Sequence, residues 1–127
     1  MTQEKNEESF VFPFEKLDVW HRAVDLADCT LNLMQSLPPN TYSGLTSQME
    51  TAVSRVAQHI AEGKGRQYKK EFIQLLHRAE GSLFEVLTVT ALLKRRGCIR
   101  EQEGTEIRRQ AEIIDRMLHG LMNSLQK

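Results

Sequence analysis

QHIAEGKGRQYKKEFIQLLHRAEGSL, residues 58–83, contains the end of one helix, a short turn and most of a second helix. Gly63 follows an apolar helical run and precedes several cations, a pattern that is typical of a left-handed helix C-cap. Gly81 interrupts a run that is periodic on both sides. Because glycine costs about 1 kcal/mol relative to alanine inside a helix, we expect another backbone to approach closely at Gly81. The stretch predicts a helical hairpin.

Apolar residues at steps of three and four predict four helices along the chain. We expect Ser43 to cap the second helix, with Thr46 as the alternative if that helix starts later. The predicted core positions, helix by helix, are Leu17, Trp20, Val24, Ala27, Leu31 and Met34; Leu45, Met49, Ala52, Val53, Val56, Ile60 and Ala61; Phe72, Leu76, Ala79, Leu83, Val86, Thr90 and Leu93; and Ile107, Ala111, Ile114, Leu118, Leu121 and Leu125.

Short connections separate these helices. Pro38 and Pro39 end the first helix, residues 63–67 turn the chain after the second, and residues 97–101 turn it after the third. Since short turns join antiparallel neighbours, the sequence predicts an all-α fold, an antiparallel up-down-up-down four-helix bundle.

The chain of 127 residues corresponds to one domain, with an N-terminal tail at 1–13 and the bundle at 14–127. Cys29 and Cys98 are far apart and have no partner at metal spacing, so we expect reduced thiols. The tail is polar and acidic, unlike a signal peptide, and no run approaches the roughly 18 apolar residues of a membrane span. We therefore expect a cytoplasmic protein without a membrane partner.

Extra apolar positions indicate a homo-oligomer. The first helix adds Val19, Leu26 and Leu33, and the fourth adds Ile113, Met117 and Met122. These positions either widen the core-facing stripe or form a second face that is buried between subunits. The aromatic run at residues 10–14 favours the second interpretation, and we expect the whole tail to be ordered against protein.

Positive charge is concentrated in residues 64–100, which hold nine Lys or Arg residues against three Asp or Glu. Cations gather at helix C-termini because of the helix dipole, and they also contact phosphates, so both interpretations stay open. Tyr68 offers a ring for base stacking beside the first group. The predicted nucleic-acid-binding residues are Lys64, Arg66, Lys69 and Lys70 at one end of the bundle, and Lys94, Arg95, Arg96 and Arg100 at the other.

Histidines with a carboxylate one turn away raise the alternative of a bundle metalloenzyme. The pairs are His59 with Glu62, His77 with Glu80, and Asp18 with His21. Di-metal bundles use inward-facing Glu-x-x-His motifs, and here two of the three pairs run in the opposite order. The fourth helix adds only Asp115 and His119, so the ligand set does not close.

We therefore predict no metal site, no cofactor and no catalytic residue. Ser54 and Ser82 have no glycine-framed elbow, and EGKGR follows a helix where a phosphate loop would follow a strand. We expect His59 to be partly buried and hydrogen-bonded across the bundle, and His77 to lie at the surface.

A series of short blocks resembles one known family from Phe14 to the end of the chain. The blocks are Phe14, Leu17, Val19-Trp20, Ala23, Leu37-Pro38, Gly44-Leu45, Gln48, Ala52, Val56, Ile60-Ala61-Glu62-Gly63, Gly65-Arg66, Glu71-Phe72, Leu75 and Ala79-x-Gly81-Ser82-Leu83-x-Glu85. They look like the four-helix bundle family of 23S rRNA intervening-sequence proteins. The family usually has asparagine where this chain has His59.

The resemblance implies a small cytosolic bacterial protein without recognised catalytic residues. A related branch, the accessory proteins of diversity-generating retroelements, forms homopentamers that bind nucleic acid and a reverse transcriptase through basic surface. Arg66 and its basic neighbours match the family's basic turn. We therefore expect a non-enzymatic homo-oligomer, with a pentamer implied by the resemblance, whose candidate partners are RNA, DNA or a nucleic-acid-processing protein. A purely protein–protein scaffold is the main alternative.

Overall fold

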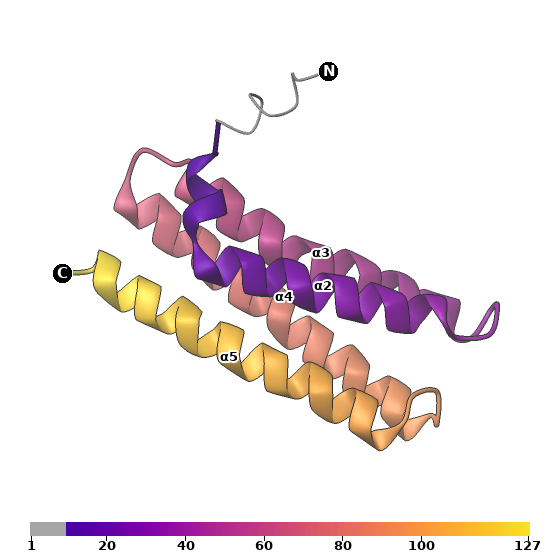
Figure 1. The fold of residues 1–127 in the computed structure, drawn as a ribbon. Coiled ribbons are helices and arrows are strands. Elements are labelled where there is room, and N and C mark those ends of the chain that lie inside the picture. The colour runs from indigo at the N-terminus through magenta and orange to yellow at the C-terminus, as the bar shows by residue number, and fades with distance from the viewer. Residues whose placement is uncertain (1–9) are drawn as a thin grey trace, which may run out of the picture.

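The computed structural model describes residues 10–127, and these form a four-helix bundle as predicted. A short 3-10 helix, η1 (Pro13–Lys16), precedes four helices, which are α2 (Asp18–Gln35), α3 (Ser43–Lys64), α4 (Lys69–Arg95) and α5 (Glu101–Leu125). Figure 1 shows consecutive helices running in opposite directions. Helices α2 and α4 each pack against both α3 and α5, whereas within the described residues the diagonal pairs bring no Cα atoms within 8 Å of each other.

The core forms where the apolar stripes of the four helices meet. In α4 all seven predicted positions are buried, and in α3 and α5 most are, while Leu45, Ala61, Leu121 and Leu125 at the helix ends are half-buried. No helix within residues 10–127 is both long and apolar enough to cross a membrane.

In α2 the predicted core stripe was wrong at two of its six positions, since Met34 is buried and Leu17, Trp20 and Ala27 are half-buried against the core. Val24 and Leu31 are each 38% exposed, whereas Val19 and Leu26, which were expected on a second face, are buried. The true stripe also contains Ala23 and the polar Thr30, and both are fully buried. Because Ala23 and Thr30 are less apolar than Val24 and Leu31, hydrophobicity alone selected the two exposed residues in place of the two buried ones.

Neither Gly63 nor Gly81 has the role that the sequence predicted for it. Helix α3 continues through Gly63 to Lys64, and its C-cap Gly65 has a right-handed φ of −84°, so there is no left-handed cap. Gly63 is buried, and a Cβ there would lie 2.7 Å from Phe72 Cδ1. Gly81 is exposed, and a Cβ there would meet no atom within 4 Å. The close approach between α3 and α4 therefore occurs at Gly63.

Helix α3 begins at Ser43, so Ser43 is its first residue and not its N-cap. Its N-cap is Tyr42, with a left-handed φ of 41°, so neither Ser43 nor Thr46 is the cap. A left-handed residue other than glycine costs about 1–2 kcal/mol. The Arg96 guanidinium offsets part of this cost, because its Nε donates to Tyr42 Oη at 2.9 Å and the group lies over the Tyr42 ring.

The aromatic run of the tail continues onto the bundle, whereas residues 1–9, whose order the sequence also predicted, lie outside the described residues. Ring centroids are separated by 4.7 Å between Phe10 and Phe12, 5.9 Å between Phe12 and Phe14, and 4.9 Å between Phe14 and Trp20. Helix η1 contacts α2 and α3. Phe10 and Phe12 nevertheless remain 66% and 54% exposed, so the bundle of a single chain leaves much of this segment uncovered.

The fourth helix does not carry the second apolar face that the sequence predicted. Ile113 and Met117 are half-buried and Met122 is buried, so these three residues belong to a wide core stripe on α5. Large exposed apolar side chains lie instead on α4, at Phe84 and Leu92.

Candidate nucleic-acid interface

The two predicted groups of cations lie at opposite ends of the bundle, as expected. Lys64, Arg66, Lys69 and Lys70 surround the turn between α3 and α4, and we call them the α3–α4 cluster. Lys94, Arg95, Arg96 and Arg100 surround the turn between α4 and α5, and we call them the α4–α5 cluster. The 27-residue helix α4 separates the two by about 40 Å, and Figure 1 shows the two turns far apart.

The α4–α5 cluster is largely engaged with other side chains. Lys94 Nζ lies 3.3 Å from Glu101 Oε2, and Arg96 is bound to Tyr42. Arg100 is the N-cap residue of α5, where its guanidinium lies 3.0 Å from Glu103 Oε2 and its backbone N–H donates to Glu103 Oε1 at 2.8 Å. These contacts give three of the four residues in this cluster a structural role.

The α3–α4 cluster is mostly unpaired. Arg66 Nη2 forms an ion pair of 2.7 Å with Glu62 Oε2. Lys64, Lys69 and Lys70 form no ion pair with any residue from 10 to 127. Three lysine ammonium groups at this turn are thus available for an anionic partner.

Lys69 and Lys70 occupy positions that the helix dipole disfavours. They are the first two residues of α4, and the N-terminus of a helix carries partial positive charge. Lys64, in the last turn of α3, is the member of this cluster that the dipole does explain. The helix dipole therefore does not explain the charge of Lys69 and Lys70.

Tyr68 adds to the anion-binding character of the start of α4. It is the N-cap residue, its side chain makes no capping hydrogen bond, and it is 60% exposed. Within the described residues no side chain caps the backbone N–H groups of Lys69 and Lys70, and uncapped N–H groups at a helix start can bind anions. The exposed ring can also stack on a base.

A shallow groove beside this turn adds a cation that the predicted site lacked. Its volume is about 180 Å³, and it is lined by Arg66, Glu71, Gln74, Leu75 and Arg78. Arg78 follows Lys70 and Gln74 at steps of four, so the three lie along one face of α4. This spacing was visible in the sequence and could have identified Arg78.

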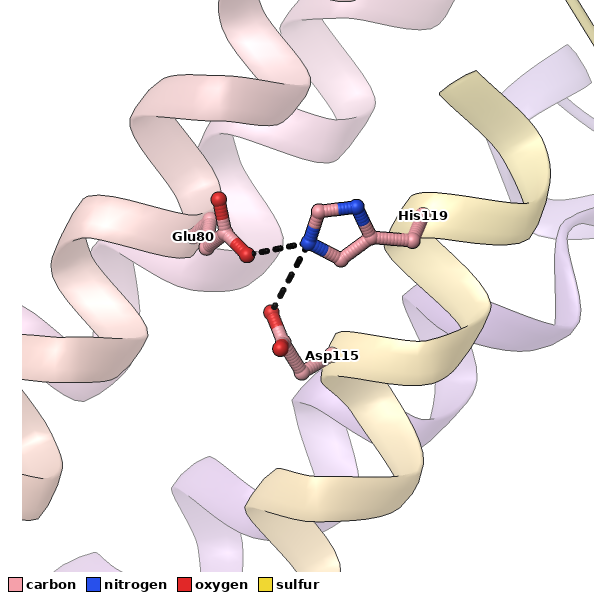
Figure 2. Close-up of side chains that lie close together, drawn as sticks. All are labelled: Glu80, Asp115 and His119. Carbon is pink, nitrogen blue, oxygen red and sulfur yellow. Dashed lines mark hydrogen bonds and ion pairs between the residues drawn. The ribbon is translucent and has the colours of Figure 1, made fainter. Parts of the chain in front are cut away.

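A second group of polar side chains lies between α4 and α5, and we call it the Glu80 cluster (Figure 2). His119 Nε2 of α5 is 2.6 Å from Glu80 Oε2 of α4 and 3.9 Å from Asp115 Oδ1. On α4, His77 Nδ1 lies 3.9 Å from Glu80 Oε1. The di-metal pattern in the sequence requires ligands that face the bundle centre. These residues lie between two helices, so that pattern did not predict their contact.

The carboxyl groups of the Glu80 cluster influence each other. Partial burial and the neighbouring Glu80 carboxyl raise the pKa of Asp115 to about 6. Burial also acts to raise the pKa of Glu80, but contacts with Asp115 and His119 outweigh it and hold that pKa below its ordinary value. Two carboxyl groups this close favour a state in which they share one proton.

The two predictions for other histidines have different outcomes. His77 has a side chain that is 58% exposed, so its surface position is confirmed. His59 is partly buried as predicted, but its Nδ1 has no hydrogen-bond partner among the described residues and lies 3.8 Å from Glu62 Oε1 on the same helix. The predicted hydrogen bond across the bundle was therefore wrong for the described residues.

Most of the chain matches a known protein family. The family model described as 23S rRNA-intervening sequence protein matches residues 15–120, which span all of α2, α3 and α4 and most of α5. Among curated proteins, none matches the sequence.

Proposed function

The chain belongs to the 23S rRNA-intervening sequence protein family, and from this membership we propose that it is a non-enzymatic, homo-oligomeric module that binds structured nucleic acid. The observation that carries the proposal is the pair Lys69 and Lys70, which stand unpaired at the N-terminus of α4 within the described part of the chain. The α3–α4 cluster, extended by Arg78, is the binding surface.

Phosphate groups are the part of a nucleic acid that this surface fits. Lysine and arginine side chains neutralise phosphates and release the counterions that surround the polymer, which gives affinity without reading sequence. The Tyr68 ring can stack on one base regardless of its identity. We therefore expect RNA and DNA to bind with little sequence preference.

Fluorescence anisotropy tests this function directly. The full chain is titrated into labelled RNA and, separately, labelled DNA at about 50 mM and about 200 mM salt. Several phosphate contacts would weaken binding by orders of magnitude over this range. If neither polymer binds at the lower salt, the proposal is wrong and a protein–protein scaffold takes its place.

Oligomer formation is the second part of the proposal, and exposed apolar side chains support it. Phe10, Val11 and Phe12 form an uncovered segment, while Val24 and Leu31 lie exposed on one face of α2. Large apolar patches on proteins in solution usually mark interfaces. Copies assembled through this surface would also multiply the α3–α4 cluster.

Light scattering tests the oligomer. The wild-type chain is expected to give a multiple of the 14.6 kDa monomer mass at micromolar concentration. Changing both Phe10 and Phe12 to Asp should dissociate the particle, whereas the control Phe84→Asp places a charge at an exposed aromatic site on α4 and should not. A wild-type monomer mass would contradict the proposal. If the tail variant leaves the particle intact, as the control does, the interface lies outside the tail.

A further inference from the structure

The Glu80 cluster presents metal-binding atoms from two packed helices. Glu80 Oε, Asp115 Oδ and His119 Nε2 all lie within 4.8 Å of one another. Residues three or four apart share one helix face, so the pair His77 and Glu80 on α4 faces the pair Asp115 and His119 on α5. Figure 2 shows Glu80, Asp115 and His119 converging on one point between the helices.

The separations suit a small divalent cation. Zinc binds nitrogen and oxygen ligands at about 2.0–2.2 Å, which places the ligands of a tetrahedron about 3.4 Å apart. The 3.9 Å between His119 Nε2 and Asp115 Oδ1 is close to that value. The 2.6 Å between His119 Nε2 and Glu80 Oε2 must lengthen by less than 1 Å. His119 can make this adjustment, because its side chain is 54% exposed.

One oxygen of Asp115 has no hydrogen-bond donor among the described residues. This Oδ1 atom is buried, although buried polar atoms are normally satisfied. The neighbouring Glu80 carboxyl can act as its partner only while the two groups share one proton, and the two carboxylates repel each other when both are ionised. A dication would bind both oxygens and would neutralise their combined charge of two.

We propose that Glu80, Asp115 and His119 bind one divalent cation of the zinc type, with His77 as a fourth ligand. A mixture of imidazole and carboxylate ligands suits Zn²⁺ better than Ca²⁺ or Mg²⁺, which prefer oxygen alone. His77 lies outside this set of three but is one turn from Glu80 on α4, with its Nδ1 3.9 Å from Glu80 Oε1, and its exposed side chain can turn towards the ion. The ion would connect α4 to α5 and so would stabilise the bundle, independently of nucleic-acid binding.

Calorimetric titration of the full chain with Zn²⁺, after removal of bound metal by a chelator, tests the site. The wild type is expected to bind one ion per chain, and the ion should raise the melting temperature. Asp115→Asn preserves the shape of the side chain and His119→Ala removes the imidazole. Each should weaken binding by more than the roughly 10- to 100-fold that follows loss of an outer partner of a metal ligand.

His59→Ala is the matched control, because His59 and Glu62 have the same spacing as His77 and Glu80 and a similar separation of 3.8 Å. This variant should bind Zn²⁺ as the wild type does. His77→Ala should weaken binding, and unchanged affinity would exclude His77 as a ligand. The site itself is overturned if the wild type shows no saturable binding, or if Asp115→Asn and His119→Ala bind as tightly as His59→Ala. Circular dichroism on each variant verifies that the helices persist.

Discussion

The two ends of α4 hold four cations each, yet the neighbours of those cations differ. At the α4–α5 turn, Lys94 and Arg100 pair with glutamates and Arg96 donates a hydrogen bond to Tyr42. At the α3–α4 turn, Lys69 and Lys70 have no such partner in residues 10–127 and stand where the helix dipole opposes them. Each cluster has the same number of cations. The two clusters differ in the side chains that pair with those cations and in where the cations lie relative to the helix dipole.

Changing both Lys69 and Lys70 to Gln should have the largest effect on RNA binding. Each lost contact with single-stranded RNA lowers the slope of log affinity against log salt by about 0.7, which is about a fivefold loss at 0.1 M salt. We therefore expect RNA binding to weaken on the order of 25-fold and the salt slope to fall by about 1.4. Anisotropy titrations at several salt concentrations measure both quantities. An unchanged slope would mean that neither lysine contacts phosphate.

The same double variant should become more stable. Removing a cation from a helix N-terminus relieves an unfavourable dipole interaction of about 0.3–1 kcal/mol per residue. Matching Gln substitutions at Lys94 and Arg95, in the last turn of α4, should lower stability by a similar amount. Urea unfolding of the two double variants measures the difference, and shifts of the same sign at both ends would contradict the role of the dipole.

Gly63→Ala tests the packing that brings α3 and α4 together beside the α3–α4 cluster. The new Cβ would lie 2.7 Å from Phe72 Cδ1 and 3.1 Å from Leu75 Cβ, both buried neighbours. We expect overpacking to lower the free energy of unfolding by about 1–3 kcal/mol, less the gain in helix propensity of about 1 kcal/mol. A variant more stable than the wild type by the full gain of about 1 kcal/mol would show that Phe72 gives way without cost.

Gly81→Ala should have the opposite sign. Gly81 lies between the two ends, is exposed, and leaves a Cβ with nothing to contact within 4 Å. Higher helix propensity should therefore stabilise the protein by up to about 1 kcal/mol and leave RNA affinity unchanged. A lower unfolding midpoint in a thermal melt would indicate that Gly81 is covered, for example by a neighbouring copy in an oligomer.

The smallest effect is expected from Glu101→Gln, which breaks the pair with Lys94 at the engaged end. Both side chains are partly or largely exposed, so the pair is worth roughly 0.2–1 kcal/mol. RNA affinity should change little, because freeing one cation here adds charge about 40 Å from the proposed surface. A clear gain in RNA affinity would place the α4–α5 cluster in the binding site.

The sequence predicted the fold and three of the four core stripes, because α3, α4 and α5 each have one dominant apolar face. In α2 it was wrong at Val24 and Leu31, which are exposed, because the buried Ala23 and Thr30 are less apolar than these two. Periodicity shows that a helix is amphipathic, but two adjacent faces of similar hydrophobicity can be separated only by knowing what packs against them.

The glycines and the site show the same dependence on tertiary contacts. Gly63 and Gly81 stand in the same Ala-Glu-Gly triplet, so local sequence could not reveal that only Gly63 meets a neighbouring helix. The basic residues were identifiable from composition, whereas their pairing was not. The Glu80 cluster depends on the register between α4 and α5, which no spacing within one helix can show.

The central claim is that the α3–α4 end alone contacts nucleic acid, and two matched charge reversals test it most directly. One variant changes Lys64, Arg66, Lys69 and Lys70 to Glu, and the other changes Lys94, Arg95, Arg96 and Arg100 to Glu, so both alter the net charge equally. Anisotropy with labelled RNA at about 50 mM salt compares them, once circular dichroism and light scattering show that both keep the helices and the assembly of the wild type. We predict no detectable binding for the first variant and, for the second, a salt slope equal to that of the wild type. Equal loss of binding in both variants, or loss only in the second, would contradict the account.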